Sequence, residues 1–262
     1  MESVLKPTAK QVAHEAGVSI AAVSRAFSPG SSIDPLKRQR ILQVAAQLGY
    51  SSPARRTAEV ISAGMANACR QHGIRVVLLN RIQRNVRVNA VACDNHAGGR
   101  DAALFLLGRG RRRIGFIGGI SNTSTHRDRA EGFSEALRES GHSVLAEGNG
   151  EFTYRGSYGA VLSLLTAKNR PDALFCCNDI MALAAIDAAR ELGLSAPEDL
   201  SIVGFDDIPM AGWRSYRLTT IRQPITRMIS EVVGLIQASK TVPLDETTTS
   251  ILPGKLIVRG SA

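Results

Sequence analysis

Residues 8–27 read TAKQVAHEAGVSIAAVSRAF, a stretch that predicts two short helices joined by a tight turn. The apolar spacing favours a first helix over residues 9–16, and Gly17 follows it where helices often end in a left-handed residue. Ser19 is placed to cap a second helix over residues 20–27 after a turn of only three residues. Two short helices in such close succession are typical of the helix-turn-helix motif.

A third helix completes a small all-α headpiece. Asp34 predicts its cap, and Pro35 predicts its first turn. The helix stops at Gly49, and the polar stretch over residues 51–57 is suited to a linker. We therefore expect residues 1–57 to form a headpiece and linker. The expected headpiece core is Val12, Val23, Ile41, Val44 and Leu48.

The second helix has an apolar face and an exposed face. At 100° per residue, the apolar face packs on the other two helices and the opposite face stays in solvent. An exposed face that carries an arginine suits the major groove of DNA, where Arg25 can donate to guanine O6 and N7 together. Thr8 and Ser19, at two helix N-termini, are suited to phosphate contacts. An ordinary helical bundle with a solvated face is the alternative. The exposed face is Ile20, Ala21, Ser24 and Arg25.

The distribution of charge favours a polyanion as partner. The 262-residue chain has a formal net charge of +9. Residues 1–57 carry eight Lys and Arg against three Asp and Glu, and residues 58–114 carry ten against three. Residues 115–262 carry fourteen against seventeen, so the positive excess lies in the first part of the chain. A basic end on a near-neutral body is typical of nucleic-acid binding, and a basic solvated surface is the alternative.

Beyond residue 57, short apolar runs alternate with helical stretches. This alternation predicts an α/β fold, in which parallel strands are covered by helices on both faces. The expected strands are residues 74–80, 88–93, 114–117, 173–177 and 200–205. The expected helices are residues 63–72, 96–109, 127–140, 156–166, 179–192 and 224–239.

Polar side chains directly follow two of the expected strands. Asn178 and Asp179 follow the run ALFCC, and Asp206 and Asp207 follow SIVGF. The carboxyl ends of parallel strands meet at one edge of a sheet, where ligands bind in open α/β folds. Carboxylates and an amide there can bind hydroxyl groups, with Arg129 as a charge-assisted donor. The alternative for the aspartates and for Asn178 is a helix or turn cap.

Other kinds of site find no support in the sequence. The four cysteines show no CxxC pair and no metal-ligand spacing with a histidine, so we expect reduced thiols and no metal. The motifs GxGxxG, HExxH and GxSxG are missing, so we expect neither enzyme activity nor a cofactor. No apolar run approaches the length of a membrane span, and the first ten residues lack the apolar stretch of a signal peptide. The sequence therefore predicts a cytoplasmic protein without membrane contact.

The headpiece and four later segments together resemble the lac-repressor family of bacterial transcription regulators. The later segments are RDRAEGF (residues 127–133), RPDALFCCNDIMALAAI (170–186), PEDLSIVGFDDIP (197–209) and LTTIRQP (218–224), and they follow the family's order. The resemblance implies a helix-turn-helix headpiece and a periplasmic-binding-protein-like core with a ligand cleft between two subdomains. It also implies a regulator, typically a repressor, that binds a double-stranded DNA operator as a homodimer and responds to a small, sugar-like effector.

The resemblance also assigns residues to these contacts by position. It assigns base contacts to Ile20, Ala21 and Arg25. Ile20 and Ala21 donate no side-chain hydrogen bond, so they are limited to thymine methyl groups, and a bland helix surface is their alternative. The effector contacts that the resemblance assigns are Arg129, Phe152, Asn178 and Asp206, with Phe152 placed to stack on the ligand.

One subdomain of the implied core is short. Only about one helix separates the linker from the expected strand at residues 74–80, whereas the family has on the order of seventy more residues here. The join falls between Arg56 and Glu59. The expected division is residues 58–95 plus 223–262 as the truncated N-terminal subdomain of the core, and residues 96–222 as its C-terminal subdomain.

Three other interpretations compete with an active regulator. An α/β enzyme with a helical appendage is disfavoured because no nucleophile–base motif is present. A sugar- or solute-binding protein is disfavoured by the headpiece and by the lack of a signal peptide. An inactive truncated regulator would result if the loss at the join abolishes dimerisation or the response to effector.

Overall fold

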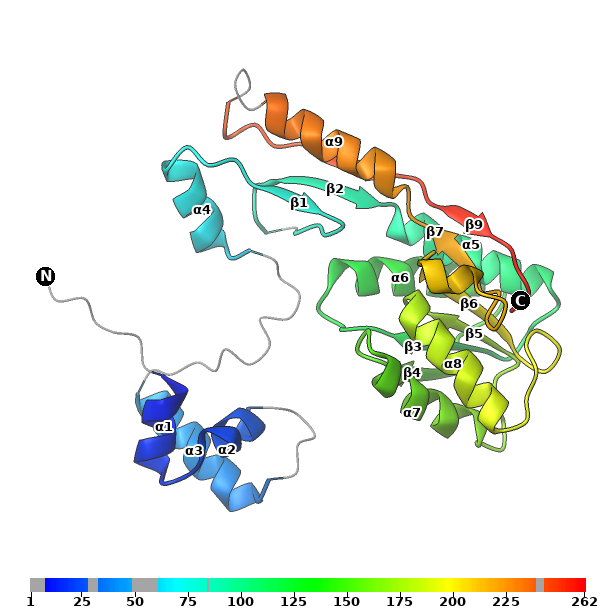
Figure 1. Cartoon of the computed structure of the whole chain (residues 1–262), viewed down its shortest axis with the longest axis horizontal. Coiled ribbons are helices and arrows are strands. Elements are labelled where there is room, and N and C mark those ends of the chain that lie inside the picture. The colour runs from blue at the N-terminus through cyan, green and yellow to red at the C-terminus, as the bar shows by residue number, and fades with distance from the viewer. Residues whose placement is uncertain (1–7, 28–32, 49–60, 84, 239–242) are drawn as a thin grey trace, which may run out of the picture. The chain divides into compact units, whose positions relative to one another are not determined.

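The computed structural model describes residues 8–27, 33–48, 61–83, 85–238 and 243–262 (Figure 1). The chain divides into two compact units, Met1–Thr57 and Ala58–Ala262. Among the described residues, no helix is long and apolar enough to cross a membrane.

The first unit contains the three predicted helices, α1 (Ala9–Ala16), α2 (Ile20–Ala26) and α3 (Pro35–Gln47). Thr8 and Gln11 cap α1 reciprocally, and Gly17 ends it with φ 65°, a conformation that a side chain disfavours. Leu48 was expected in the core but is exposed, because it lies beyond the last turn of α3. The buried core is Val12, Ala13, Ala16, Ala22, Val23, Ala26, Ile41 and Ala45.

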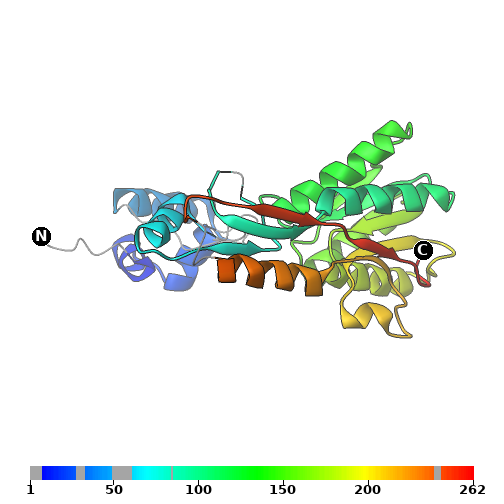
Figure 2. The same ribbon diagram turned by 90° about the horizontal axis from the view of Figure 1, so that it is seen from above.

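The second unit contains a larger sheet of six strands in the order β4-β3-β5-β6-β7-β9. All pairs are parallel except β7 with β9. Helices α5 and α6 lie together on one face of this sheet, and α7 and α8 lie together on the other (Figure 2). The strands are β3 (Ile114–Gly118), β4 (Ala146–Asn149), β5 (Ala173–Cys176), β6 (Ser201–Asp206), β7 (Thr219–Arg222) and β9 (Lys255–Ile257). The helices are α5 (Asn95–Gly108), α6 (Ser124–Glu139), α7 (Tyr154–Leu165), α8 (Asp179–Glu191) and the short 3₁₀ helix η1 (Pro209–Gly212).

Two glycines let α5 and α6 pack closely. A Cβ at Gly99 would lie 2.2 Å from the carbonyl oxygen of Arg129, and a Cβ at Gly132 would lie 2.0 Å from that of His96. Any side chain at either position would push the helices apart. This close approach fixes α6, and with it Arg129, against the start of α5.

A smaller sheet has three parallel strands in the order β1-β2-β8. They are β1 (Val77–Leu79), β2 (Asn89–Cys93) and β8 (Thr249–Leu252), and the flanking helices are α4 (Ala63–Gln71) and α9 (Ile225–Gln237). Helix α9 packs on these strands and buries Met228. A second apolar stripe on α9 is left between 44% and 54% exposed, and it consists of Ile225, Ile229, Val233 and Ile236.

The structure corrects the expected division of this unit at its C-terminal end. Residues 223–262 were assigned to the truncated subdomain, but β9 pairs with β7 in the larger sheet. The strand expected over residues 74–80 is shorter, because only Val77–Leu79 pair with β2. The six predicted helices of this unit are confirmed, each to within three residues at its ends.

Candidate functional site

The exposed face predicted for α2 is present. Ile20, Ala21, Ser24 and Arg25 are exposed, whereas Ala22, Val23 and Ala26 are buried against α1 and α3. The Arg25 Nε donates to the carbonyl oxygen of Ala21 at 3.3 Å, so the side chain lies along the exposed face. This arrangement supports the predicted contact with base edges.

Thr8 and Ser19 both cap helices. The Thr8 hydroxyl oxygen accepts from the backbone N–H of Gln11 at 3.4 Å, and that of Ser19 accepts from Ala22 at 3.2 Å. Each side chain therefore lies at a helix N-terminus, where backbone N–H groups attract anions. Phosphate contact by these residues stays a prediction.

Arg129 is the centre of a polar cluster at the carboxyl ends of the larger sheet's strands. Its side chain is 2% exposed. Its Nε donates to Asn95 Oδ1 at 2.8 Å, its Nη1 to the carbonyl oxygen of Cys177 at 2.5 Å, and its Nη2 to Asp206 Oδ1 at 3.2 Å. The guanidinium also lies 3.6 Å from the centroid of the Phe205 ring. These contacts satisfy a buried charge that would otherwise be costly.

Asp206 ends β6 and faces Arg129. Its Oδ1 also accepts from Gln223 Nε2 at 2.6 Å. Burial raises the pKa of the Asp206 carboxyl, and the positive charge of Arg129 opposes that rise. Sequence reasoning thus placed Arg129 and Asp206 correctly at one edge of the sheet, and the structure brings them into contact.

Sequence reasoning missed two residues near this cluster, Gln223 and Arg81. Gln223 directly follows β7, and Asn80 and Arg81 directly follow β1. Arg81 Nη1 donates to Thr125 Oγ1 at the start of α6, at 2.7 Å. Burial and the charge of Arg129 lower the pKa of Arg81, and Asp206 opposes that fall. The rule that pointed to Asp206, a polar residue directly after a strand, missed Gln223 because β7 was not predicted, and missed Asn80 because it was placed inside the expected strand.

Two amide oxygens here have no hydrogen-bond partner among the described residues. They are Gln223 Oε1 and Asn80 Oδ1, and both atoms are buried. An unsatisfied buried acceptor costs about 1–3 kcal/mol, so Gln223 Oε1, beside Asp206, is suited to a donor that a ligand supplies. Hydroxyl groups are such donors.

Asn178 and Asp179 have different roles. Asn178 Oδ1 accepts from the backbone N–H of Met181 at 3.0 Å. Asn178 therefore caps α8, which was the alternative to ligand binding that the sequence offered. Asp179 is buried and does not cap the helix. It accepts instead from Thr220 Oγ1 at 2.5 Å and from the backbone N–H of Ile208 at 2.8 Å. Burial raises the pKa of Asp179 to about 7.

Phe152 lies over the end of β3. Its ring is so close to Gly119 that a Cβ there would be 2.2 Å from the ring carbon Cζ. Phe152 has φ 58°, and its side chain is half-buried against the larger core. Gly119 also donates to His126 Nδ1 at 3.1 Å. No contact between Phe152 and Arg129 or Asp206 is described, so its stacking role stays a prediction.

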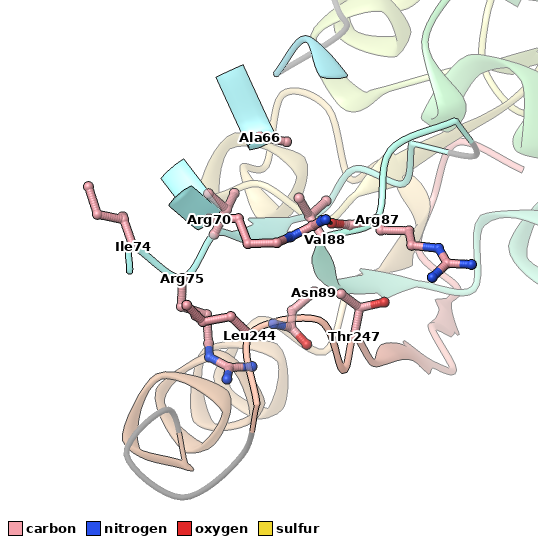
Figure 3. A pocket seen from close by; sticks show the side chains of 10 residues that line it. Ala66, Arg70, Ile74, Arg75, Arg87, Val88, Asn89, Leu244 and Thr247 are labelled. Carbon is pink, nitrogen blue, oxygen red and sulfur yellow. The ribbon is translucent and has the colours of Figure 1, made fainter. Parts of the chain in front are cut away.

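A separate cavity lies in the smaller part of this unit and does not fit an effector. Figure 3 shows it between α4, β2 and the segment before β8, with Arg70, Arg75 and Arg87 in its lining. Its volume of about 20 Å³ is enough for about one water molecule. Sites for small organic ligands are about 300–1,000 Å³.

Two family descriptions match this chain. Residues 8–52 match the bacterial regulatory proteins of the lacI family, and residues 103–262 match the periplasmic binding protein-like domain. The first match covers the helix-turn-helix, and the second covers most of the larger sheet with its polar cluster.

Several known proteins are similar to this chain. An HTH-type transcriptional regulator of the aml 5′ region of Streptomyces limosus is 34% identical over 200 residues, which is 73% of this chain and 55% of that protein. The repressor PurR of Haemophilus influenzae is 40% identical over 152 residues, which is 56% of this chain and 45% of PurR. The chain thus spans about half the length of the curated relatives it matches. A solved complex of the transcriptional regulator CelR with cellobiose is 26% identical with a TM-score of 0.66, covering 98% of this chain and 100% of CelR.

Proposed function

Because this chain belongs to the lacI family of bacterial regulatory proteins, we propose that it is a DNA-binding transcription repressor controlled by a small polyhydroxy effector. The observation that carries the proposal is the exposed face of α2 on a complete three-helix headpiece. The net positive charge of residues 1–57 supports a DNA partner. A cytoplasmic location, and a homodimer on a palindromic operator, are part of this proposal.

Arg25→Ala is expected to weaken binding to the preferred site by about 1–3 kcal/mol per half-site and to relax preference at one base pair. The reason is the loss of two donors to a guanine edge. The preferred sites would first be selected from a random-sequence library with the unsubstituted protein. The affinity of each protein for these sites would then be measured by mobility shift at several salt concentrations. Arg40→Ala, on the exposed surface of α3, is the matched control. The assignment fails if Arg25→Ala leaves both affinity and base preference unchanged.

The effector part of the proposal rests on the polar cluster. Arg129 offers charge-assisted donors, Asp206 offers a carboxylate, and Gln223 offers an unsatisfied oxygen. A molecule with several hydroxyl groups both donates and accepts, so it matches this set better than an apolar ligand does. The cellobiose in the similar CelR complex agrees with this class. Contacts to Asn178 and Phe152 remain part of the proposal.

Asp206→Asn is expected to lower the affinity for a polyol effector about 30-fold, which corresponds to about 2 kcal/mol for the loss of a charged acceptor. Asparagine preserves the size and shape of the side chain, so the substitution removes the charge alone. Calorimetry with cellobiose, ribose and a wider sugar panel would measure the affinity of both proteins. Asp172→Asn, which removes a carboxylate paired with Arg113 elsewhere, is the control. Equal affinity of the two variants for a bound sugar would contradict the role of Asp206.

We also propose that the core lacks a segment of on the order of seventy residues between Arg56 and Glu59. Support comes from the smaller sheet, which has three strands among the described residues whereas the larger has six. The proposed division is a headpiece over residues 1–57, a truncated subdomain over 58–95 with 223–252, and a second subdomain over 96–222 with 255–262.

A further inference from the structure

The turn that follows β6 has an unusual backbone. Asp206 and Asp207 are consecutive residues with φ of 120° and 58°. Residues with a side chain rarely adopt positive φ, and two in succession persist only where the surroundings hold them. The contacts of Asp207 show what holds this turn.

Asp207 is bound by two arginines from distant parts of the chain. Its Oδ2 accepts from Arg222 Nε at 2.5 Å, and its Oδ1 accepts from Arg259 Nη2 at 2.6 Å. The Asp207 side chain is 6% exposed. Arg259 is itself fixed, since its Nη1 donates to the carbonyl oxygen of Leu218 and its backbone N–H donates to Thr219 Oγ1. A carboxylate this buried would be costly to leave with only one of these partners.

One of the two arginines lies next to a place where the chain passes between the two sheets, and the other lies beyond the far end of β9. Through the described residues the chain passes after β2, after β7 and between β8 and β9. Arg222 is the last residue of β7, and Arg259 follows β9 by two residues. The passage after β2 contributes Asn95, which binds Arg129, the partner of Asp206. The passages after β2 and after β7 are therefore connected by hydrogen bonds to the Asp206–Asp207 turn, and so is the segment after β9.

We propose that Asp207 is a positioning residue that holds the passage after β7 and the segment after β9, and so fixes the turn that presents Asp206 to the ligand. The ligand-binding half of this inference rests on the function proposed above. Because Asp206 and Asp207 are adjacent, a ligand that moves the Asp206 carboxylate also strains the Arg222 and Arg259 contacts. Ligand binding is thereby coupled to a segment that joins the two sheets.

The first test needs no ligand. Hydrogen exchange of the full chain would be compared among the unsubstituted protein, Asp207→Asn and the control Asp172→Asn. Asp207→Asn is expected to raise exchange at least 10-fold in peptides that contain residues 206–208, 222–224 and 255–260, while β3 and β5 keep their protection. Asp172→Asn should leave those three regions unchanged. Unchanged exchange in Asp207→Asn, or a uniform rise across the larger sheet, would overturn the proposal.

The second test uses cellobiose and ribose as probes in calorimetry. Asp207→Asn and Arg259→Gln should each weaken sugar binding about 10-fold, and the double variant should be no weaker than either. Arg259→Lys, which keeps the positive charge, should recover part of the affinity. Additive losses, or full affinity in Asp207→Asn, would overturn the positioning role. If neither sugar binds the unsubstituted chain while the exchange result holds, the proposed effector class fails and the positioning of the turn stands.

Discussion

Raising the pH from about 4 to above 7 is expected to remove about 4 kcal/mol from the free energy of unfolding through Asp179 alone. Burial raises the pKa of this carboxyl from its ordinary value of 3.8 to about 7. The hydrogen bonds from Thr220 and Ile208 oppose the rise, and the charges of Asp206 and Asp207 add to it. The folded state then keeps a proton that the unfolded chain has lost. Stability from this group is therefore complete below about pH 4 and is lost as the pH rises through about 7.

Asp179→Asn isolates this effect, because asparagine keeps the shape and does not ionise. Denaturant unfolding of both proteins at several pH values should show the difference moving in favour of the variant as the pH rises from 5 to 8. Asp172→Asn is the control, since that side chain lies at the other end of the strands and faces Arg113. Parallel stability curves for Asp179→Asn and the unsubstituted protein would contradict the raised pKa.

The headpiece was predictable because its signals are local. Gly17 and Ser19 mark the end of one helix and the start of the next within three residues, and the structure uses both. The faces of α2 follow from the helical period alone, which is why Val23 is buried and Arg25 is exposed. Leu48 was wrongly predicted to be buried, because the helical period does not indicate where the neighbouring helices end.

The polar cluster was predictable in part. Asp206 was found because a buried strand ends directly before it, and Arg129 because its segment resembles the family. Gln223 and Arg81 follow short strands, and the residues that bind them come from elsewhere in the sequence. The pairing of Asp207 with Arg259 joins residues 52 positions apart in the chain, and no local pattern indicates it.

The short strands at the edges of the larger sheet were the hardest elements to predict from the sequence. The sequence of β4 is AEGN, which has no apolar run; among the described strands it pairs only with β3, and its residues are alternately half-buried and exposed. Strand β9 has three residues and pairs antiparallel with β7 after the chain returns from the smaller sheet. Its place in the larger sheet depends on tertiary packing, so the expected division of the core was wrong there.

The smaller sheet exposes a strand edge and apolar side chains that further strands or helices would cover. Among the described strands, β1 lies at the edge of this sheet, and Leu79 on it is 45% exposed. Helix α9 adds the exposed stripe of Ile225, Ile229, Val233 and Ile236. Apolar surface beside an unpaired strand edge is a known cause of self-association, and soluble proteins normally cover or charge such edges.

Inserting a family-like segment between Arg56 and Glu59 is therefore expected to raise the melting temperature by roughly 10–20 °C and to reduce aggregation. Covering the four half-exposed side chains of the α9 stripe contributes about 1–1.5 kcal/mol each, hence about 5 kcal/mol. In a domain of this size each kcal/mol corresponds to about 2–4 °C. Calorimetry and light scattering would compare the two proteins. Ile229→Glu with Ile236→Glu, in the chain without the insert, should reduce aggregation without raising the melting temperature, because charge masks the stripe but buries nothing. A sharp, reversible transition from the unaltered chain, with no gain from the insert, would show that the smaller sheet needs no further strands.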